Sequence, residues 1–139
     1  MLGDSIMNWF KKAEQKISYT AIVLDLNSHD LLLKNLSPFI PEGWKTYSHH
    51  MTINMGSAKD KSEVGNTVSL TATQWAKDDK AIAVMIEGYQ LKDARTPHVT
   101  VAVNIEGGGK PKDSNGLKGW QPLSNPVSLT GVIQEVPAS

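Results

Sequence analysis

The 139-residue chain contains no cysteine, so disulfide bonds and catalysis by a thiolate are excluded. It also lacks net charge, with 14 basic and 14 acidic residues, which argues against a long polyanion as the main partner because counterion release requires a basic surface. No apolar run approaches the roughly 20 residues that span a bilayer, and the N-terminus lacks the apolar core of a signal peptide. The missing apolar segments predict a cytoplasmic protein without membrane contact, whereas the missing cysteine leaves the compartment open. The length predicts one domain over residues 1–139.

The pattern of apolar residues predicts an α+β fold with mostly antiparallel strands, six or seven in number, and two or three helices. Apolar side chains at helical spacing predict an N-terminal amphipathic helix over residues 1–17. A second helix is predicted over 29–36, with Ser28 as its N-cap and Pro38 and Pro41 beyond its end. Residues that favour β-structure predict strands at 19–26, 49–55, 67–77, 80–89, 98–105 and 126–136.

Two of these predicted strands repeat one pattern, "SHHMTINMG" and "TPHVTVAVN", although the chain has only four histidines. Each copy contains a histidine, one apolar residue and a threonine. Because side chains alternate between the two faces of a strand, His50 shares a face with Thr52, and His98 shares a face with Thr100. If the two strands lie near each other in one sheet, the two pairs converge on a single groove.

Two histidines and two hydroxyls suit the cleavage of a phosphodiester bond. One imidazole removes the proton from the attacking hydroxyl or water, and the other protonates the leaving oxygen, because an unperturbed imidazole titrates near pH 6.5. The threonine hydroxyls can donate hydrogen bonds to the phosphate oxygens as negative charge develops there. The chain has no HExxH motif and no Cys/His cluster, so the predicted mechanism uses neither a metal ion nor another cofactor.

The motifs "HMT" at 50–52 and "HVT" at 98–100 resemble those of the 2H phosphoesterase superfamily, which includes LigT-like and cyclic nucleotide phosphodiesterases. The resemblance covers most of the chain, from 19 to 136. It implies two pseudo-symmetric, mostly antiparallel β-sheet lobes around a central cleft, with helices outside. It also implies that His50 and His98 are the acid and the base, without saying which is which, and that Thr52 and Thr100 contact the phosphate.

The segments "WKTYSHHMTINMG" and "GGGKPKDSNGL" look similar to phage enzymes that degrade the cyclic di- and trinucleotide messengers of bacterial CBASS immunity. This similarity implies a small cyclic or short oligonucleotide as substrate and the host-cell cytoplasm as location. The loop 107–119 would then border the cleft, with Lys110, Lys112, Ser114 and Asn115 near phosphate or base. An exposed hairpin loop built from ordinary turn residues explains the same segment equally well.

Recognition of a base would require flat side chains, and Tyr19 and Trp75 are the favoured walls of such a pocket. Ordinary core packing explains both aromatics equally well. Glu135 could accept hydrogen bonds from a base amino group, although a solvated carboxylate is the default. His49 should point to the opposite strand face and be structural, and His29, at a predicted helix start, should be solvated or capping.

Three functions therefore stay open. The first is an enzyme that cleaves cyclic oligonucleotide messengers. The second is an enzyme with the same chemistry that opens 2′,3′-cyclic phosphates at RNA ends or cleaves 2′-5′ linkages. The third is a module that sequesters nucleotides without cleaving them, although a pure binder has no need of a second imidazole. Net charge and size favour the first, and the oligomeric state is left open.

Overall fold

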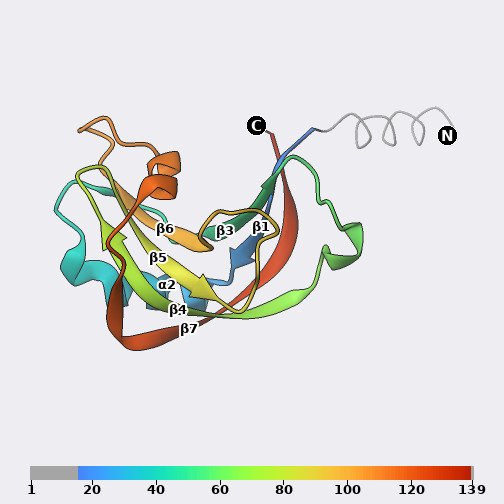
Figure 1. The fold of residues 1–139 in the computed structure, drawn as a ribbon, viewed down its shortest axis with the longest axis horizontal. Coiled ribbons are helices and arrows are strands. Elements are labelled where there is room, and N and C mark those ends of the chain that lie inside the picture. The colour runs from blue at the N-terminus through green and yellow to red at the C-terminus, as the bar shows by residue number, and fades with distance from the viewer. Residues whose placement is uncertain (1–15, 139) are drawn as a thin grey trace, which may run out of the picture.

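The computed structural model describes residues 16–138 and has the predicted α+β class (Figure 1). In chain order its elements are β1 (Ile17–Leu24), α2 (Leu26–Leu36), η1 (Ser37–Phe39), β2 (Lys45–Thr46), β3 (His50–Met55), η2 (Lys61–Glu63), β4 (Thr67–Lys77), β5 (Ala81–Glu87), β6 (His98–Val103), η3 (Pro111–Gly116) and β7 (Gln121–Pro137). The elements labelled η are short 3-10 helices.

The predicted N-terminal helix over 1–17 lies outside the described residues except for its last two positions. There the prediction is wrong, because Ile17 is already the first residue of β1. The helix predicted over 29–36 ends where expected but starts earlier, and its N-cap is Asp25 and not Ser28. The Asp25 carboxylate accepts the backbone N–H of Ser28 at 2.7 Å. The Ser28 hydroxyl instead accepts the backbone N–H of Thr130 and ties α2 to β7.

The strands in the middle of the chain agree with the prediction, and those towards its ends differ from it. β4 has the predicted bounds, and β4 and β5 form the predicted antiparallel pair. β7 spans 17 residues and starts before Pro122, so it is longer than predicted. β2 was not predicted because two residues carry no periodic signal. The glycine-rich loop contains one short helix, η3, that its turn-forming composition did not indicate.

The seven strands found in residues 16–138 form one antiparallel sheet in the order β2-β6-β5-β4-β7-β1-β3. The two edge strands, β2 and β3, belong to one continuous stretch of chain, so the sheet must curl until its edges approach each other (Figure 1). Ser48 lies between them with a left-handed φ of 61° and turns the chain from β6 towards β1. The strands of the described residues thus form one curled sheet, where the family resemblance implied two lobes.

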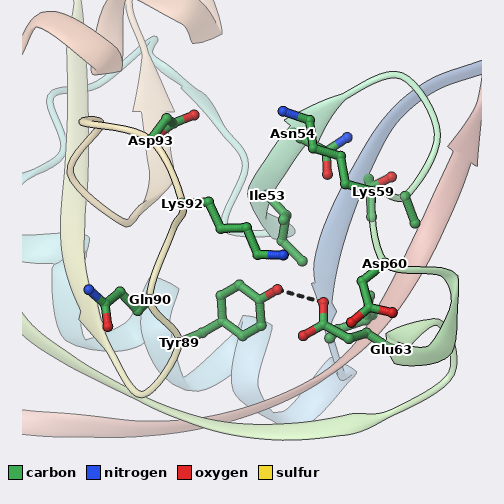
Figure 2. A pocket seen from close by; sticks show the side chains of 12 residues that line it. Ile53, Asn54, Lys59, Asp60, Glu63, Tyr89, Gln90, Lys92 and Asp93 are labelled. Atoms are coloured by element: carbon green, nitrogen blue, oxygen red, sulfur yellow. Dashed lines mark hydrogen bonds between the residues drawn. The ribbon is translucent and has the colours of Figure 1, made fainter.

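Two loops meet beside β3 and enclose a small pocket of about 90 Å³ (Figure 2). One loop follows β3 and contains η2, and the other, residues 88–97, connects β5 to β6. The Tyr89 hydroxyl donates to the Glu63 carboxylate at 2.8 Å and joins the two loops. Burial and this carboxylate raise the pKa of Tyr89 to about 12, so the phenol stays protonated as a donor. The bond holds the loop that leads directly into His98.

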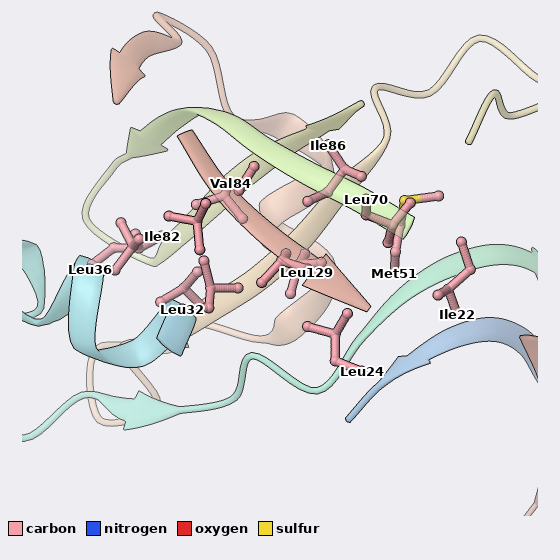
Figure 3. Packing of buried hydrophobic residues seen from close by; sticks show 14 of the residues in the cluster. Ile22, Leu24, Leu32, Leu36, Met51, Leu70, Ile82, Val84, Ile86 and Leu129 are labelled. Carbon is pink, nitrogen blue, oxygen red and sulfur yellow. The ribbon is translucent and has the colours of Figure 1, made fainter. Parts of the chain in front are cut away.

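The main core lies between one face of the sheet and α2 (Figure 3). Leu32 and Leu36 of α2 pack with Ile82, Val84 and Leu129 of the sheet, and all five side chains are buried. Full burial of each such side chain stabilises the fold by about 1.5–3 kcal/mol. Met51, Val99 and Val101, which alternate with the H-x-T residues, are completely buried on this side. The histidines and threonines of the motifs therefore point to the opposite face.

In residues 16–138, no helix is long and apolar enough to cross a membrane.

Candidate active site

The two H-x-T motifs meet where the edges of the curled sheet approach each other. β2 pairs with β6 through Lys45 opposite Val103 and Thr46 opposite Ala102. The next two residues of the chain still bond to β6, from Tyr47 N–H to the Val101 carbonyl and from Ser48 N–H to the Thr100 carbonyl. Beyond Ser48 the chain leaves β6, and the His49 carbonyl accepts from Leu24 N–H of β1. We call this opening between β3 and β6 the seam.

His50 of β3 and His98 of β6 both line this opening, and His98 is close enough to lower the pKa of His50. The hydrogen bonds that would join these positions in a closed sheet are replaced by a cleft of about 360 Å³. The cleft is lined by side chains from both motifs, from β1, from the 88–97 loop and from η3: Tyr19, Tyr47, His49, His50, Thr52, Met55, Arg95, His98, Thr100, Pro111, Lys112, Ser114 and Asn115. The prediction that both motifs line one groove is thus met in this structure.

The first half of the site consists of β3 and its neighbour β1. Val23 of β1 pairs with His50, and Ala21 pairs with Thr52. The ring of Tyr19 stacks on the His50 imidazole with centroids 5.0 Å apart. Burial, followed by the nearby His49 and His98, lowers the pKa of His50 below the ordinary 6.5. His50 is therefore a neutral imidazole near pH 7.

The second half of the site fixes the orientation of His98 through both ring nitrogens. Nδ1 lies 2.7 Å from the Thr96 carbonyl oxygen, which can only accept, so the Nδ1 proton is donated there. Nε2 lies 3.0 Å from the Ser114 hydroxyl. Burial lowers the pKa of His98, the bond to Thr96 opposes this shift, and the charge of Arg95 adds to it. The ring thus presents Nε2 as the nitrogen that exchanges protons.

Ser114 connects the two functional side chains of β6. Its Oγ lies 2.8 Å from Thr100 Oγ1, 3.0 Å from His98 Nε2 and 2.8 Å from the Pro111 carbonyl, to which it donates. The side chain is 3% exposed, so these contacts are sheltered from water. One hydroxyl proton cannot serve both Pro111 and a neutral Nε2. When Nε2 is protonated it donates to Ser114, and when it is neutral it competes for the serine proton.

η3 reaches this position because the sheet beneath it carries small side chains. Ala76, Ala81 and Ala83 are buried on the cleft side of β4 and β5, where they pack with Leu117 and, partly, Trp120. Leu117 directly follows η3 and Trp120 lies three residues further on, so both fasten η3 to the sheet. The loop 107–119 is therefore anchored beside the second half of the site and borders the cleft as predicted, although most of its residues are exposed.

The cleft favours an anionic ligand although the chain is neutral. Arg95 and Lys112 contribute positive charge, and none of the described residues that line the cleft is acidic. Arg95 donates from Nε to Asp93 at 2.9 Å and from its terminal nitrogen to the Ile53 carbonyl at 2.6 Å. Its guanidinium is thus held between the loop before β6 and strand β3. Fixed positive charge in a cleft attracts phosphate groups.

Two of the predicted pocket residues lie elsewhere. Trp75 stacks on Phe39 of η1 with ring centroids 4.0 Å apart and packs against the main core, so the alternative of core packing is correct. Glu135 accepts from the Ala58 N–H at 2.8 Å and from the Lys61 ammonium at 2.7 Å. Its carboxylate anchors the loop after β3 and does not line the cleft. Among the predicted loop residues, Lys112, Ser114 and Asn115 reach the cleft, and Lys110 does not line it.

The other two histidines lie behind the first motif. His29 donates from Nδ1 to the Ser48 carbonyl at 2.8 Å and stacks on His49 with centroids 4.8 Å apart. His29 is therefore a structural residue of α2 and not a solvated or capping one. His49 also lines the cleft, because the turn at Ser48 interrupts the regular alternation on which the contrary prediction rested. Burial, His29 and Lys45 lower the pKa of His49.

Four further residues of the cleft were not singled out as site residues from the sequence: Tyr47, Met55, Arg95 and Pro111. A basic residue three positions before a motif histidine was the one available signal for Arg95, since it had to lie near the start of the strand.

No family model, curated protein or solved structure matches the chain.

Proposed function

We propose that the protein is a metal-independent phosphodiesterase of the 2H type that cleaves cyclic oligonucleotide messengers. One observation carries the proposal. The two H-x-T pairs, 48 residues apart in sequence, stand opposite each other across one cleft whose described lining is free of carboxylates. Binding of a nucleotide alone requires neither a second imidazole nor a second hydroxyl at the mirrored position.

The proposed chemistry begins with a ribose 2′-hydroxyl of the substrate next to the scissile phosphate. A neutral imidazole takes the hydroxyl proton while O2′ forms a bond to phosphorus, and the P–O5′ bond breaks. The opposite, protonated imidazole donates its proton to O5′, so the products are a 2′,3′-cyclic phosphate end and a free 5′-hydroxyl. Thr52 and Thr100 donate hydrogen bonds to the non-bridging oxygens as their charge increases.

The hydrogen bonds of His98 support its assignment as the proton donor. Burial and nearby like charges oppose protonation of both rings, but only at His98 does a hydrogen bond, from Nδ1–H to the Thr96 carbonyl, counteract this shift. His50 is then the base, and the stacked Tyr19 keeps its ring in the cleft. Tyr19 lines the cleft and stacks on His50, which supports its role as a stacking wall for one base of the substrate. Trp75 stacks on Phe39 instead and is no longer proposed for that role.

We further propose the biological setting that the sequence resemblance implies, namely a phage protein that acts in the cytoplasm of its bacterial host against cyclic messengers of CBASS immunity. The anchored loop 107–119 over the cleft supports this branch of the superfamily, since that loop contains the segment "GGGKPKDSNGL" on which the resemblance partly rests.

The deciding experiment is incubation with cyclic dinucleotides, cyclic trinucleotides, 2′-5′ oligoadenylate and an RNA with a 2′,3′-cyclic phosphate end, followed by mass analysis of products. Linear products from the cyclic messengers alone are expected. Turnover of the RNA end or of the 2′-5′ linkage alone would select the related RNA-processing activity. Tight binding with intact recovery of every compound would show a sequestering module.

Replacing either histidine tests the assignment of the catalytic pair. His50→Ala and His98→Ala should each reduce kcat by at least about 100-fold, the usual contribution of a general acid or base, while the Kd for the substrate changes little. The two variants are compared by turnover and by calorimetric binding, with urea unfolding as the control for folding. Retained turnover in either variant would contradict the two-histidine mechanism.

A further inference from the structure

One positively charged side chain of the cleft, Arg95, is held at a fixed position along the seam. Ile53 of β3 and Arg95 of the loop before β6 lie on the two sides of the seam, each three residues from the histidine of its own motif. In a closed sheet, backbone groups would join these two positions. Here the Arg95 side chain makes the connection and donates to the Ile53 carbonyl at 2.6 Å. The seam is thus crossed by the Ser48–Thr100 backbone bond on one side of the two motifs and by the Arg95–Ile53 bond on the other.

The position of Arg95 separates its role from that of the catalytic pair. Ile53 is three residues beyond His50, which corresponds to about 10 Å along a strand. The guanidinium is held at Ile53, farther along β3 than His50, so it can bind a different phosphate from the one placed between the two imidazoles. The neighbouring phosphate of a nucleotide chain or ring, one sugar further along, lies within range.

The guanidinium retains the capacity to bind an anion. It presents five N–H donors in a planar fork, and its two side-chain bonds, to Asp93 and to Ile53, leave donors for a ligand. The Arg95 side chain is 31% exposed, so a ligand in the cleft can reach it. Asp93 is more exposed, at 53%, and water therefore weakens its neutralising effect on the arginine.

We propose that Arg95 binds a second phosphate of the substrate and makes the protein selective for ligands that carry at least two phosphates. This inference rests on the proposed function, because it takes the two H-x-T pairs as the site of the scissile phosphate. It identifies the substrate class as cyclic or linear dinucleotides and longer compounds, as opposed to single cyclic mononucleotides.

The test compares ligands with two phosphates and with one. Cyclic di-AMP and adenosine 2′,3′-cyclic monophosphate are titrated calorimetrically into protein with the His50→Ala substitution, so that neither compound is consumed. The protein with Arg95 should bind cyclic di-AMP more tightly than adenosine 2′,3′-cyclic monophosphate. Arg95→Gln should weaken that binding about 10- to 100-fold, the usual effect of losing a charged hydrogen bond, and change the mononucleotide less than about twofold.

Lys92→Gln is the matched control, because it removes one positive charge from the same loop. Lys92 lines the smaller pocket beside Tyr89 and not the cleft, so this change should leave both affinities unaltered (Figure 2). Arg95→Lys keeps the charge but loses the fork, and it should retain part of the preference for cyclic di-AMP. Urea unfolding of each variant reports any loss of stability from the missing bond to Ile53.

Three results would overturn the inference: equal weakening of both ligands by Arg95→Gln, no weakening of either, or no preference for cyclic di-AMP in the protein with Arg95. Turnover by the protein with intact His50 separates this outcome from failure of the proposed function. Arg95-dependent binding without any turnover would reject the phosphodiesterase and keep the role of Arg95. Turnover of cyclic di-AMP with the same kcat/KM in the unsubstituted protein and in Arg95→Gln would keep the phosphodiesterase and reject the role of Arg95.

Discussion

At the scale of single residues, the lowered pKa values of the two motif histidines determine how activity should depend on pH. Burial lowers both below 6.5, so each ring loses its proton at lower pH than a free imidazole. The rate falls at low pH when the base becomes protonated, and it falls at high pH when the acid is deprotonated. Because both transitions are shifted downward, the optimum of kcat/KM should lie below pH 6.5. A profile that rises through pH 7 would contradict this prediction.

Residues with a repeated local pattern could be predicted from the sequence, and residues placed by the curl of the sheet could not. Two copies of H-x-T on strands indicated four side chains on two faces, and all four line the cleft. Trp75 was misplaced because an aromatic residue on a strand packs equally well against a core, and here Phe39 covers it. Arg95 was missed because its contact with Ile53 joins segments 42 residues apart.

At the scale of elements, η3 should act on the reaction through the Ser114 hydroxyl. Ser114→Ala removes the partner of His98 Nε2 and of Thr100 while leaving the Nδ1 bond to Thr96 in place. Loss of one such hydrogen bond costs about 0.5–1.5 kcal/mol, so kcat/KM should fall about two- to tenfold. Steady-state kinetics measures this effect, and His98→Ala provides the lower limit of activity.

Ser37→Ala serves as the matched control for Ser114→Ala. Ser37 begins another 3-10 helix, η1, and donates to the Lys34 carbonyl at 3.0 Å away from the cleft. Its removal should leave kcat/KM unchanged. An increase in kcat/KM for Ser114→Ala would show instead that the serine hydroxyl competes with the substrate phosphate for His98 and Thr100.

Elements with long, regular patterns were predictable, whereas their ends and the shortest ones depended on tertiary contacts. β4 was predicted with its full bounds because its residues favour strands and a turn follows at Asp78. The start of α2 was predicted too late because Ser28, an equally good capping residue, is used to bind β7. β2 exists only because β6 offers it a partner, which no local pattern reveals.

At the scale of the whole molecule, the closure of the sheet creates the site, and this closure could not be derived from composition or periodicity. The sequence indicated two faces that might share a groove, on condition that the strands approach each other. The approach is achieved by one stretch of chain that serves both sheet edges and turns at Ser48. The order of the strands in the whole sheet brings the two motif strands, β3 and β6, near each other, so this condition is met.

The stability of this closed arrangement should depend on Gly131, where β7 passes between β1 and β4. A Cβ at this position would lie 2.6 Å from Ile22 Cγ2 and 2.8 Å from the Val23 carbonyl, closer than packed atoms tolerate. Ile22 is completely buried in the main core, so it cannot move aside without disturbing its neighbours (Figure 3). Gly131→Ala should therefore lower the free energy of unfolding by about 1–3 kcal/mol.

Urea denaturation measures the change, with Gly116→Ala as the control, since a Cβ there meets no atom within 4 Å. Because β1 carries Tyr19 and pairs with the strand of His50, the shift should also reduce kcat. Equal free energies of unfolding for Gly131→Ala and the unsubstituted protein would contradict this prediction. They would show that β1 and β7 can move apart at Gly131 without loss of stability.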